Sequence, residues 1–204
     1  MRRACFCAAV WFVSFGAATA VQGAANLLSN ANFDTDLTGW FAGGIGTAEW
    51  TSDDAGGVPT SGSAHVVSPG PGLAAIDHDC IPIEGATTYA GRAWVRVNAG
   101  NHNTSLILAA YSTPDCFHSP GGYLGSQAAT AIAEGTEQWE HLVGEVTTPA
   151  EAQSAVVSCS FGGNAVDAEC DSVYLPEAAG GGDWALASLA GLAFARRRAA
   201  CADA

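Results

Sequence analysis

The chain contains no lysine, and five of its seven arginines lie close to its two ends. Only Arg92 and Arg96 fall within residues 25–177, where eighteen Asp and Glu residues bring the formal charge to −16. Proteins that bind nucleic acids neutralise phosphates with Lys and Arg, so a surface this acidic repels nucleic acids. We therefore expect no nucleic-acid partner.

No apolar run reaches the roughly 20 residues that a membrane-spanning helix needs. The first run, residues 4–20, follows Met1-Arg2-Arg3 and ends in Ala18-Thr19-Ala20. A basic start, a short apolar stretch and small exit residues are typical of a cleaved secretory signal peptide. We assign residues 1–24 to a signal peptide and expect an exported bacterial protein, either extracellular or held at the cell envelope.

The second apolar run, residues 184–195, is followed directly by Arg196-Arg197-Arg198. A helix of this length extends only about 18 Å, but arginines placed just after an apolar run match a stop-transfer pattern. We assign residues 178–204 to a sorting tail made of a Gly-rich linker, a short hydrophobic segment and an Arg cluster. The alternative is a last apolar helix that packs on the domain.

Motifs of common enzymes are also lacking: the chain has no Gly-x-Ser-x-Gly, no His-Glu-x-x-His and no phosphate-binding loop. A glycosidase needs two carboxyl groups about 5–10 Å apart. Several acidic residues invite that interpretation, namely Asp53, Asp54, Asp77, Asp79 and Glu84. In so acidic a domain some carboxylates are neighbours by chance, and His78 is more simply a loop histidine than a base. We expect no enzymatic activity.

Four cysteines remain once the two ends are set aside: Cys80, Cys116, Cys159 and Cys170. An even number in an exported chain indicates two disulfides. Of the three possible pairings we favour Cys80–Cys116 and Cys159–Cys170, because the second pair flanks a turn-rich segment that would bring two antiparallel strands side by side. A zinc site is the alternative, but the chain has no Cys-x-x-Cys and its histidines are scattered.

The pattern of residues 87–97 alternates with a period of two, which predicts a half-buried strand. Tyr89, Ala93, Val95 and Val97 point to one side, and Thr88, Arg92, Trp94 and Arg96 to the other. Further strands are expected over residues 106–111, 139–146, 154–161 and 171–175, whereas residues 126–134 suit a short helix or a loop. Gly and Pro separate these segments at intervals of about ten residues. The fold class is therefore all-β, with residues 25–177 forming a single antiparallel β-sandwich.

Residues 26–40 carry Asn-Leu-Leu, then Asn, then Phe-Asp, then Gly-Trp. This order of motifs resembles the opening of the CenC-type carbohydrate-binding modules. Four more segments follow in order: residues 61–64, residues 85–96, Trp139 with Pro149, and residues 171–175. The resemblance implies a jelly roll of the galactose-binding-like group, with first and last strands adjacent, that binds carbohydrate without catalysis.

The same resemblance implies a structural calcium ion between the first and last strands. Asp34 matches the family's early acidic ligand and Asp171 its late one. Calcium prefers six to eight oxygen ligands, both carboxylate and carbonyl, so the residue types are suitable. The alternative is that Asp34 and Asp36 only cap a turn and that Asp171 is a solvated strand residue.

Sugar binding requires aromatic side chains that stack on the apolar face of a sugar ring. Trp94 is the best candidate because the alternation places it beside Arg92 and Arg96; Tyr111 and Tyr123 are weaker candidates. The alternative is that Trp94 packs beneath a neighbouring loop. Two functions follow: a secreted or envelope-held carbohydrate-binding protein that takes poly- or oligosaccharide, or a surface structural or interaction protein that has the jelly roll but no sugar site.

In the C-terminal tail, Leu175-Pro176-Glu177 precedes the apolar run and the arginines. This arrangement resembles the PEP-CTERM class of bacterial sorting signals, although Ala178 stands where the class has a second proline. The resemblance implies that sorting or processing machinery recognises the tail. We expect the processed protein to be a monomer.

Overall fold

The computed structural model describes residues 25–57, 61–98, 101–116, 122–134 and 137–176. The expected signal peptide and sorting tail lie outside these residues. Within them there is no helix long and apolar enough to cross a membrane. All the regular elements of this part of the chain are β-strands.

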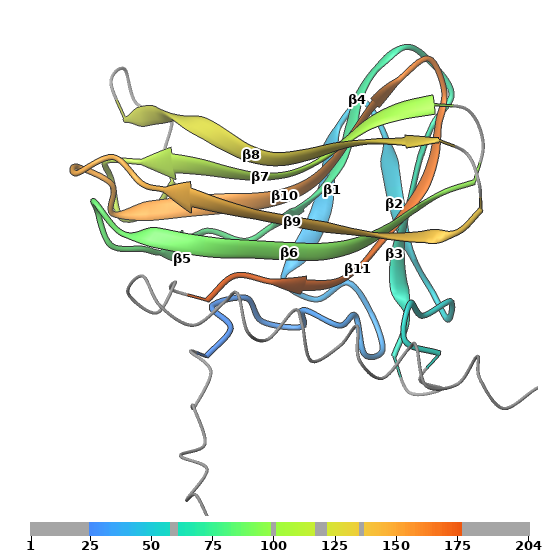
Figure 1. The fold of residues 1–204 in the computed structure, drawn as a ribbon, viewed down its shortest axis with the longest axis horizontal. Helices are drawn as coiled ribbons and strands as arrows, with labels where there is room; N and C mark the ends of the chain where they lie inside the picture. The colour runs from blue at the N-terminus through green and yellow to red at the C-terminus, as the bar shows by residue number, and fades with distance from the viewer. Residues whose placement is uncertain (1–24, 58–60, 99–100, 117–121, 135–136, 177–204) are drawn as a thin grey trace, which may run out of the picture.

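Eleven strands form two antiparallel sheets, which pack face to face as a sandwich (Figure 1). The six-stranded sheet has the order β1 (Trp40–Gly44), β4 (Gly72–His78), β10 (Ser154–Gly163), β7 (Asn101–Tyr111) and β8 (Tyr123–Glu134), with β5 (Ile81–Pro82) also paired to β10. The five-stranded sheet has the order β2 (Thr47–Thr51), β3 (Ser63–Ser68), β11 (Val166–Tyr174), β6 (Thr88–Val97) and β9 (Trp139–Thr147). The prediction of an all-β sandwich is confirmed.

The alternation of side chains along each strand between the two faces of its sheet decides which of them enter the core. In β6, Tyr89, Ala93 and Val95 are fully buried, whereas Arg92 and Arg96 are partly exposed and Trp94 is exposed, as the pattern predicted. The inward residues of the other sheet meet them from the opposite side, among them Ile76, Val157 and Phe161. Their burial supplies the main stabilisation of the domain.

The expectation of a helix or loop over residues 126–134 is wrong, because these residues belong to β8. This strand pairs with β7 from Tyr111 to Asn101, with one irregularity near Gly125, whose φ is +121°. The local sequence is rich in alanine, which favours helix in isolation. Backbone hydrogen bonds to a long neighbouring strand outweigh that weak preference.

Both expected disulfides are present, with Cα–Cα distances of 5.8 Å for Cys80–Cys116 and 6.4 Å for Cys159–Cys170. The strands around the second pair, however, do not lie side by side as expected. β10 pairs with β4, β5 and β7, while β11 pairs with β3 and β6. The short turn between them passes from one sheet to the other, so Cys159–Cys170 links the two sheets through the core.

The first and last parts of the domain are adjacent, as the resemblance implied (Figure 1). The Val173 N–H donates to the Ala31 carbonyl at 2.9 Å. The Asn26 side chain donates to the Val173 carbonyl at 3.0 Å and accepts from the Leu175 N–H at 2.8 Å. These bonds place residues 26–31 beside the end of β11.

Candidate functional site

The five residues predicted to bind ligand lie on two different sheets. Tyr111 and Tyr123 belong to β7 and β8 of the six-stranded sheet. Arg92, Trp94 and Arg96 belong to β6 of the five-stranded sheet and point outward. The structure therefore forms two separate groups and brings no single five-residue site together.

The outer face of the six-stranded sheet carries the first group. Asp77 pairs in register with Phe41 on one side and with Ser158 on the other, so these three side chains point the same way. Their neighbours Trp40, Ile76, Val157 and Cys159 are in the core, which places the three on the outside. We define the Asp77 face as the following outward residues: Phe41, Asp77, Ser158, Ser160, Tyr111 and Tyr123.

Asp77 is half-buried at the centre of this face. Burial raises the pKa of the Asp77 carboxyl, and a hydrogen bond with Ser158 partly offsets that rise. A Cβ atom on Gly43 would lie 2.3 Å from Oδ2 of Asp77, so the carboxylate lies across β1 at a position that only glycine leaves open. The strand pair β1–β4 thus holds a carboxylate flat against the sheet.

Two tyrosines bound the face at its other side. The rings of Tyr111 and Tyr123 are 5.6 Å apart and tilted by 55°. Tyr111 is only 3% exposed, whereas Tyr123 is 47% exposed, so the buried ring supports the exposed one. Burial raises the pKa of Tyr111, and the charges of Tyr123 and Asp77 raise it further, which is consistent with all three lying on one side of the sheet.

A disulfide-anchored segment lies over the same face. The Cys116 N–H donates to Oγ of Ser154 at 3.1 Å, and that hydroxyl donates to the Thr113 carbonyl at 2.6 Å. Ser154 is the register partner of Tyr111 and points outward from β10. Residues 113–116 therefore lie against the outside of the sheet, and the bond between Cys80 and Cys116 fixes them there.

Ser160 is a further polar group on the Asp77 face. Its Oγ atom is buried and has no hydrogen-bond partner within the described residues. An unsatisfied buried hydroxyl costs about 1–3 kcal/mol, and at 2% exposure Ser160 is covered by its neighbours. The face thus combines aromatic rings at its sides with polar groups between them.

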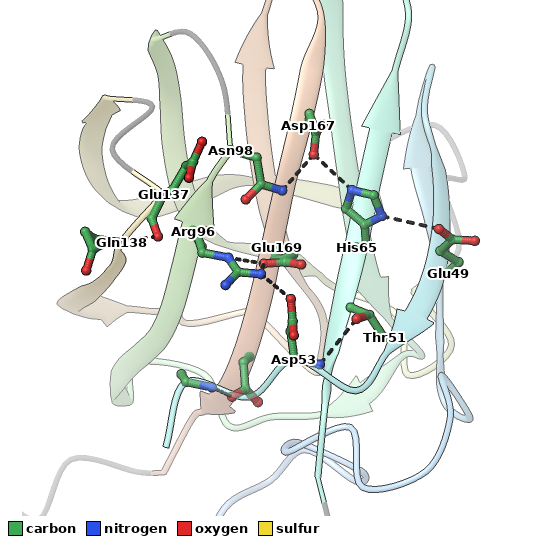
Figure 2. Close-up of polar contacts among 12 residues, drawn as sticks. Glu49, Thr51, Asp53, His65, Arg96, Asn98, Glu137, Gln138, Asp167 and Glu169 are labelled. Carbon is green, nitrogen blue, oxygen red and sulfur yellow. Dashed lines mark hydrogen bonds and ion pairs between the residues drawn. The ribbon is translucent and has the colours of Figure 1, made fainter. Parts of the chain in front are cut away.

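The outer face of the five-stranded sheet carries charged pairs (Figure 2). Arg96 bonds to Glu169 and, at 2.6 Å, to Asp53, while its guanidinium lies 5.0 Å from the centre of the Trp139 ring. In the same row His65 lies between two carboxylates (Figure 2), 3.3 Å from Glu49 and 3.0 Å from Asp167. These carboxylates balance the charge of Arg96 within this face.

Trp94 stands beside this network. It is 36% exposed and stacks on His141 of β9, with ring centres 4.6 Å apart and planes 21° apart. Arg92 lies 6.0 Å from the centre of the Tyr174 ring. Trp94 is therefore not covered by a loop, but one of its faces is already occupied by His141.

Asp171 also points outward from β11, yet it is fully buried, so the alternative that it is a solvated strand residue is wrong. The segment after β2 covers it, and the Ala55 N–H donates to its Oδ2 atom at 2.9 Å. Burial raises the pKa of Asp171 to about 6, and the charge of Asp54 contributes. Asp34 is exposed, and Asp36 caps a turn by accepting from the Thr38 N–H at 2.8 Å.

The described part of the chain contains no group of three or more His, Cys, Asp or Glu side chains positioned for a metal ion. A calcium site at Asp171 would therefore depend on backbone carbonyls and hydroxyls as well as carboxylates. Ser63 precedes Ala64, the register partner of Cys170, and so lies beside Asp171; its buried Oγ has no hydrogen-bond partner within the described residues. Carboxylate and hydroxyl oxygens are both ligands that calcium accepts, so these two residues are compatible with that ion.

Sequence reasoning did not assign Phe41 to a site and treated Asp77 as one of many carboxylates. The signal was the alternation in two short segments: Phe41 follows the buried Trp40, and Asp77 lies between the buried Ile76 and His78. What the sequence did not give was the pairing of β1 with β4, which sets these two residues side by side.

Comparisons with known proteins agree with this architecture. The family model of the carbohydrate binding domain matches residues 25–164. No curated protein matches the chain. Three solved structures, all at 14% identity, show the same fold. A Clostridium thermocellum xylanase, Xyn10B, matches over 72% of this chain and 28% of its own, with a TM-score of 0.58.

The C-terminal family 22 carbohydrate-binding module of the same xylanase matches over 75% of this chain and 94% of its own, with a TM-score of 0.58. A family 61 carbohydrate-binding module matches over 76% of this chain and 99% of its own, with a TM-score of 0.51. The chain thus spans about a quarter of the multidomain xylanase but nearly the whole length of the isolated modules. Modules of this type bind sugars and are not themselves catalytic. Since the family model covers more than half of its residues, the chain belongs to the carbohydrate binding domain family.

Proposed function

We propose that this protein binds a poly- or oligosaccharide on the Asp77 face. The observation that carries the proposal is the exposed Tyr123 ring held against the buried Tyr111, on the same face as Phe41, which is 48% exposed. Aromatic rings with polar groups between them suit a sugar chain, whose apolar faces stack and whose hydroxyls form hydrogen bonds. Two structural neighbours were solved with xylohexaose and with β-1,4-galactotriose, so xylan and galactan are the first ligands to test.

Retention of the exported protein in gels containing these polysaccharides tests the proposal. We expect Tyr123→Ala to weaken retention roughly tenfold, which corresponds to about 1.4 kcal/mol. Trp94→Ala removes an exposed ring from the other sheet and serves as the matched control. If Trp94→Ala weakens retention and Tyr123→Ala does not, sugar binding belongs to Trp94, Arg92 and Arg96. Absence of retention on any polysaccharide would favour a structural or interaction protein with no sugar site.

We further propose a structural calcium ion at Asp171, with Asp34 as the early carboxylate. The Val173 bond to Ala31 supports this pairing, because it holds the loop that contains Asp34 beside the end of β11. Asp54, whose charge acts on Asp171, is a second candidate. Bound calcium would offset the cost of burying the Asp171 carboxylate and tie the first loop to the last strand.

The remaining proposals concern the whole protein. We propose that it is exported through residues 1–24 and sorted through residues 178–204, and that it acts at the bacterial envelope or outside the cell. Two disulfides support an oxidising location. We also propose that the complete chain has no catalytic activity and that the processed protein is a monomer.

A further inference from the structure

Asp77 is the acidic group at the centre of the Asp77 face, and its position gives that face a selectivity. We propose that the Asp77 carboxylate accepts hydrogen bonds from the hydroxyl groups of an uncharged sugar and repels sugars that carry a carboxylate of their own. This inference rests on the proposed carbohydrate-binding function of the same face. It assigns Asp77 as the residue that determines specificity.

The geometry leaves the carboxylate available to hydroxyl donors. An ionised carboxylate has two oxygens with about four acceptor positions. Asp77 uses one of them for its bond with Ser158, and its Oδ2 lies against the Gly43 backbone. Asp77 is half-buried, so part of it faces solvent. Hydrogen bonds from hydroxyls to a carboxylate are about twice as strong as those between neutral groups, so the free positions favour sugar hydroxyls.

The distribution of charge explains the rejection of acidic sugars. Arg92 and Arg96 are the only lysine or arginine residues between positions 25 and 177, and both lie on β6 in the other sheet. The Asp77 face therefore has no basic side chain among the described residues that would bind a sugar carboxylate. A second negative charge there would meet Asp77 in a partly desolvated setting, where like charges repel strongly.

Gly43 provides a way to move the carboxylate without removing its charge. The Cβ of Gly43→Ala would come within 2.3 Å of Oδ2 and displace the end of the Asp77 side chain. The backbone of β1 has no reason to change, because the atoms in conflict are the mobile end of that side chain. Gly43→Ala and Asp77→Asn therefore separate the position of the carboxylate from its charge.

The test measures affinity of the exported protein for matched pairs of polysaccharides at pH 7. One pair is a galactan and the same galactan after oxidation of its primary hydroxyls to carboxylates; the other is plain xylan and glucuronic acid-substituted xylan. We expect the wild-type protein to bind the neutral member at least tenfold more tightly. Asp77→Asn should lose about tenfold on the neutral member and most of the discrimination. Gly43→Ala should also lose affinity, and Asp79→Asn, which removes an exposed charge nearby, should behave as wild type.

A pH series adds a readout that loss of folding cannot imitate. Protonation of Asp77 removes a strong acceptor, so wild-type affinity should fall as the pH is lowered through its raised pKa, while Asp77→Asn should vary little. Folded Asp77→Asn with wild-type affinity and selectivity would overturn the inference and leave the proposed function intact. If Tyr123→Ala and Asp77→Asn both bind as wild type, the proposed site itself is wrong, and the inference fails with it.

Discussion

His65 of β3 lies 3.0 Å from Asp167 of β11 through its Nε2 atom, and its Nδ1 atom lies 3.3 Å from Glu49 of β2. Both partners are carboxylates, which only accept hydrogen bonds. A neutral imidazole donates from one nitrogen alone, so only the protonated ring satisfies both contacts. Burial lowers the pKa of His65, but the hydrogen bonds to Asp167 and Glu49 outweigh that effect and raise it.

Stability should therefore be greater at pH 5 than at pH 8 when calcium is absent. A folded-state pKa above the unfolded value means that the folded protein binds more protons, and the resulting stabilisation is lost as pH rises through the folded pKa. His65 and Asp171 act in the same direction, since burial raises the pKa of Asp171 to about 6, whereas the lowered pKa of His141 opposes them. Thermal unfolding in EDTA across this range checks the prediction. His65→Gln should reduce the pH dependence, and a melting temperature that rises from pH 5 to pH 8 would contradict it.

Calcium should raise the melting temperature, and more so at pH 8 than at pH 5. A ligand that binds only the folded state adds about 2.7 kcal/mol at a hundredfold excess over its Kd. Protons compete for the Asp171 carboxylate below about pH 6, which weakens calcium binding. Calorimetry in calcium, in EDTA and in sodium chloride of equal ionic strength separates binding from screening. Asp171→Ala should abolish the calcium effect, and equal melting temperatures in calcium and EDTA would rule the ion out.

The two disulfides should have different roles. Removing Cys80–Cys116, a bond between residues 36 apart, should cost about 4 kcal/mol of stability in the chain-entropy model and should also weaken sugar binding. The reason is that residues 113–116 would no longer be fixed against Ser154. Removing Cys159–Cys170 should lower stability alone, because that bond is inside the core. Melting temperature and polysaccharide affinity of the two double Cys→Ser variants check this; equal loss of affinity in both would show that the segment has no part in binding.

The two ends of the chain should direct export and sorting of the protein. Cleavage is expected after about residue 20 to 24, and deletion of residues 184–204 should release the domain into the medium. N-terminal sequencing and fractionation of cells that express the full and the shortened chain measure both events. Identical distribution of the two forms would show that the tail does not direct sorting.

The sequence by itself determined which residues of β6 face the core. Period-two alternation in residues 88–97 was sufficient to place Val95 inside and Trp94 outside, because side chains of a strand alternate whatever its neighbours are. The cysteine pairs were also predictable, since few pairings were possible. The family followed from an ordered set of short motifs that spans most of the domain.

Only the tertiary structure decided which strands are neighbours, and with that the site. Pairing of β1 with β4 brings Phe41 and Gly43 to Asp77, and pairing of β7 with β8 brings Tyr123 to Tyr111. The turn after β10 crosses to the other sheet, so Cys159 and Cys170 meet through the core and not along a hairpin. Residues 126–134 became a strand for the same reason: backbone hydrogen bonds to a partner distant in sequence are stronger than the local preference of alanine. Such contacts depend on segments far apart in the chain, and no local pattern encodes them.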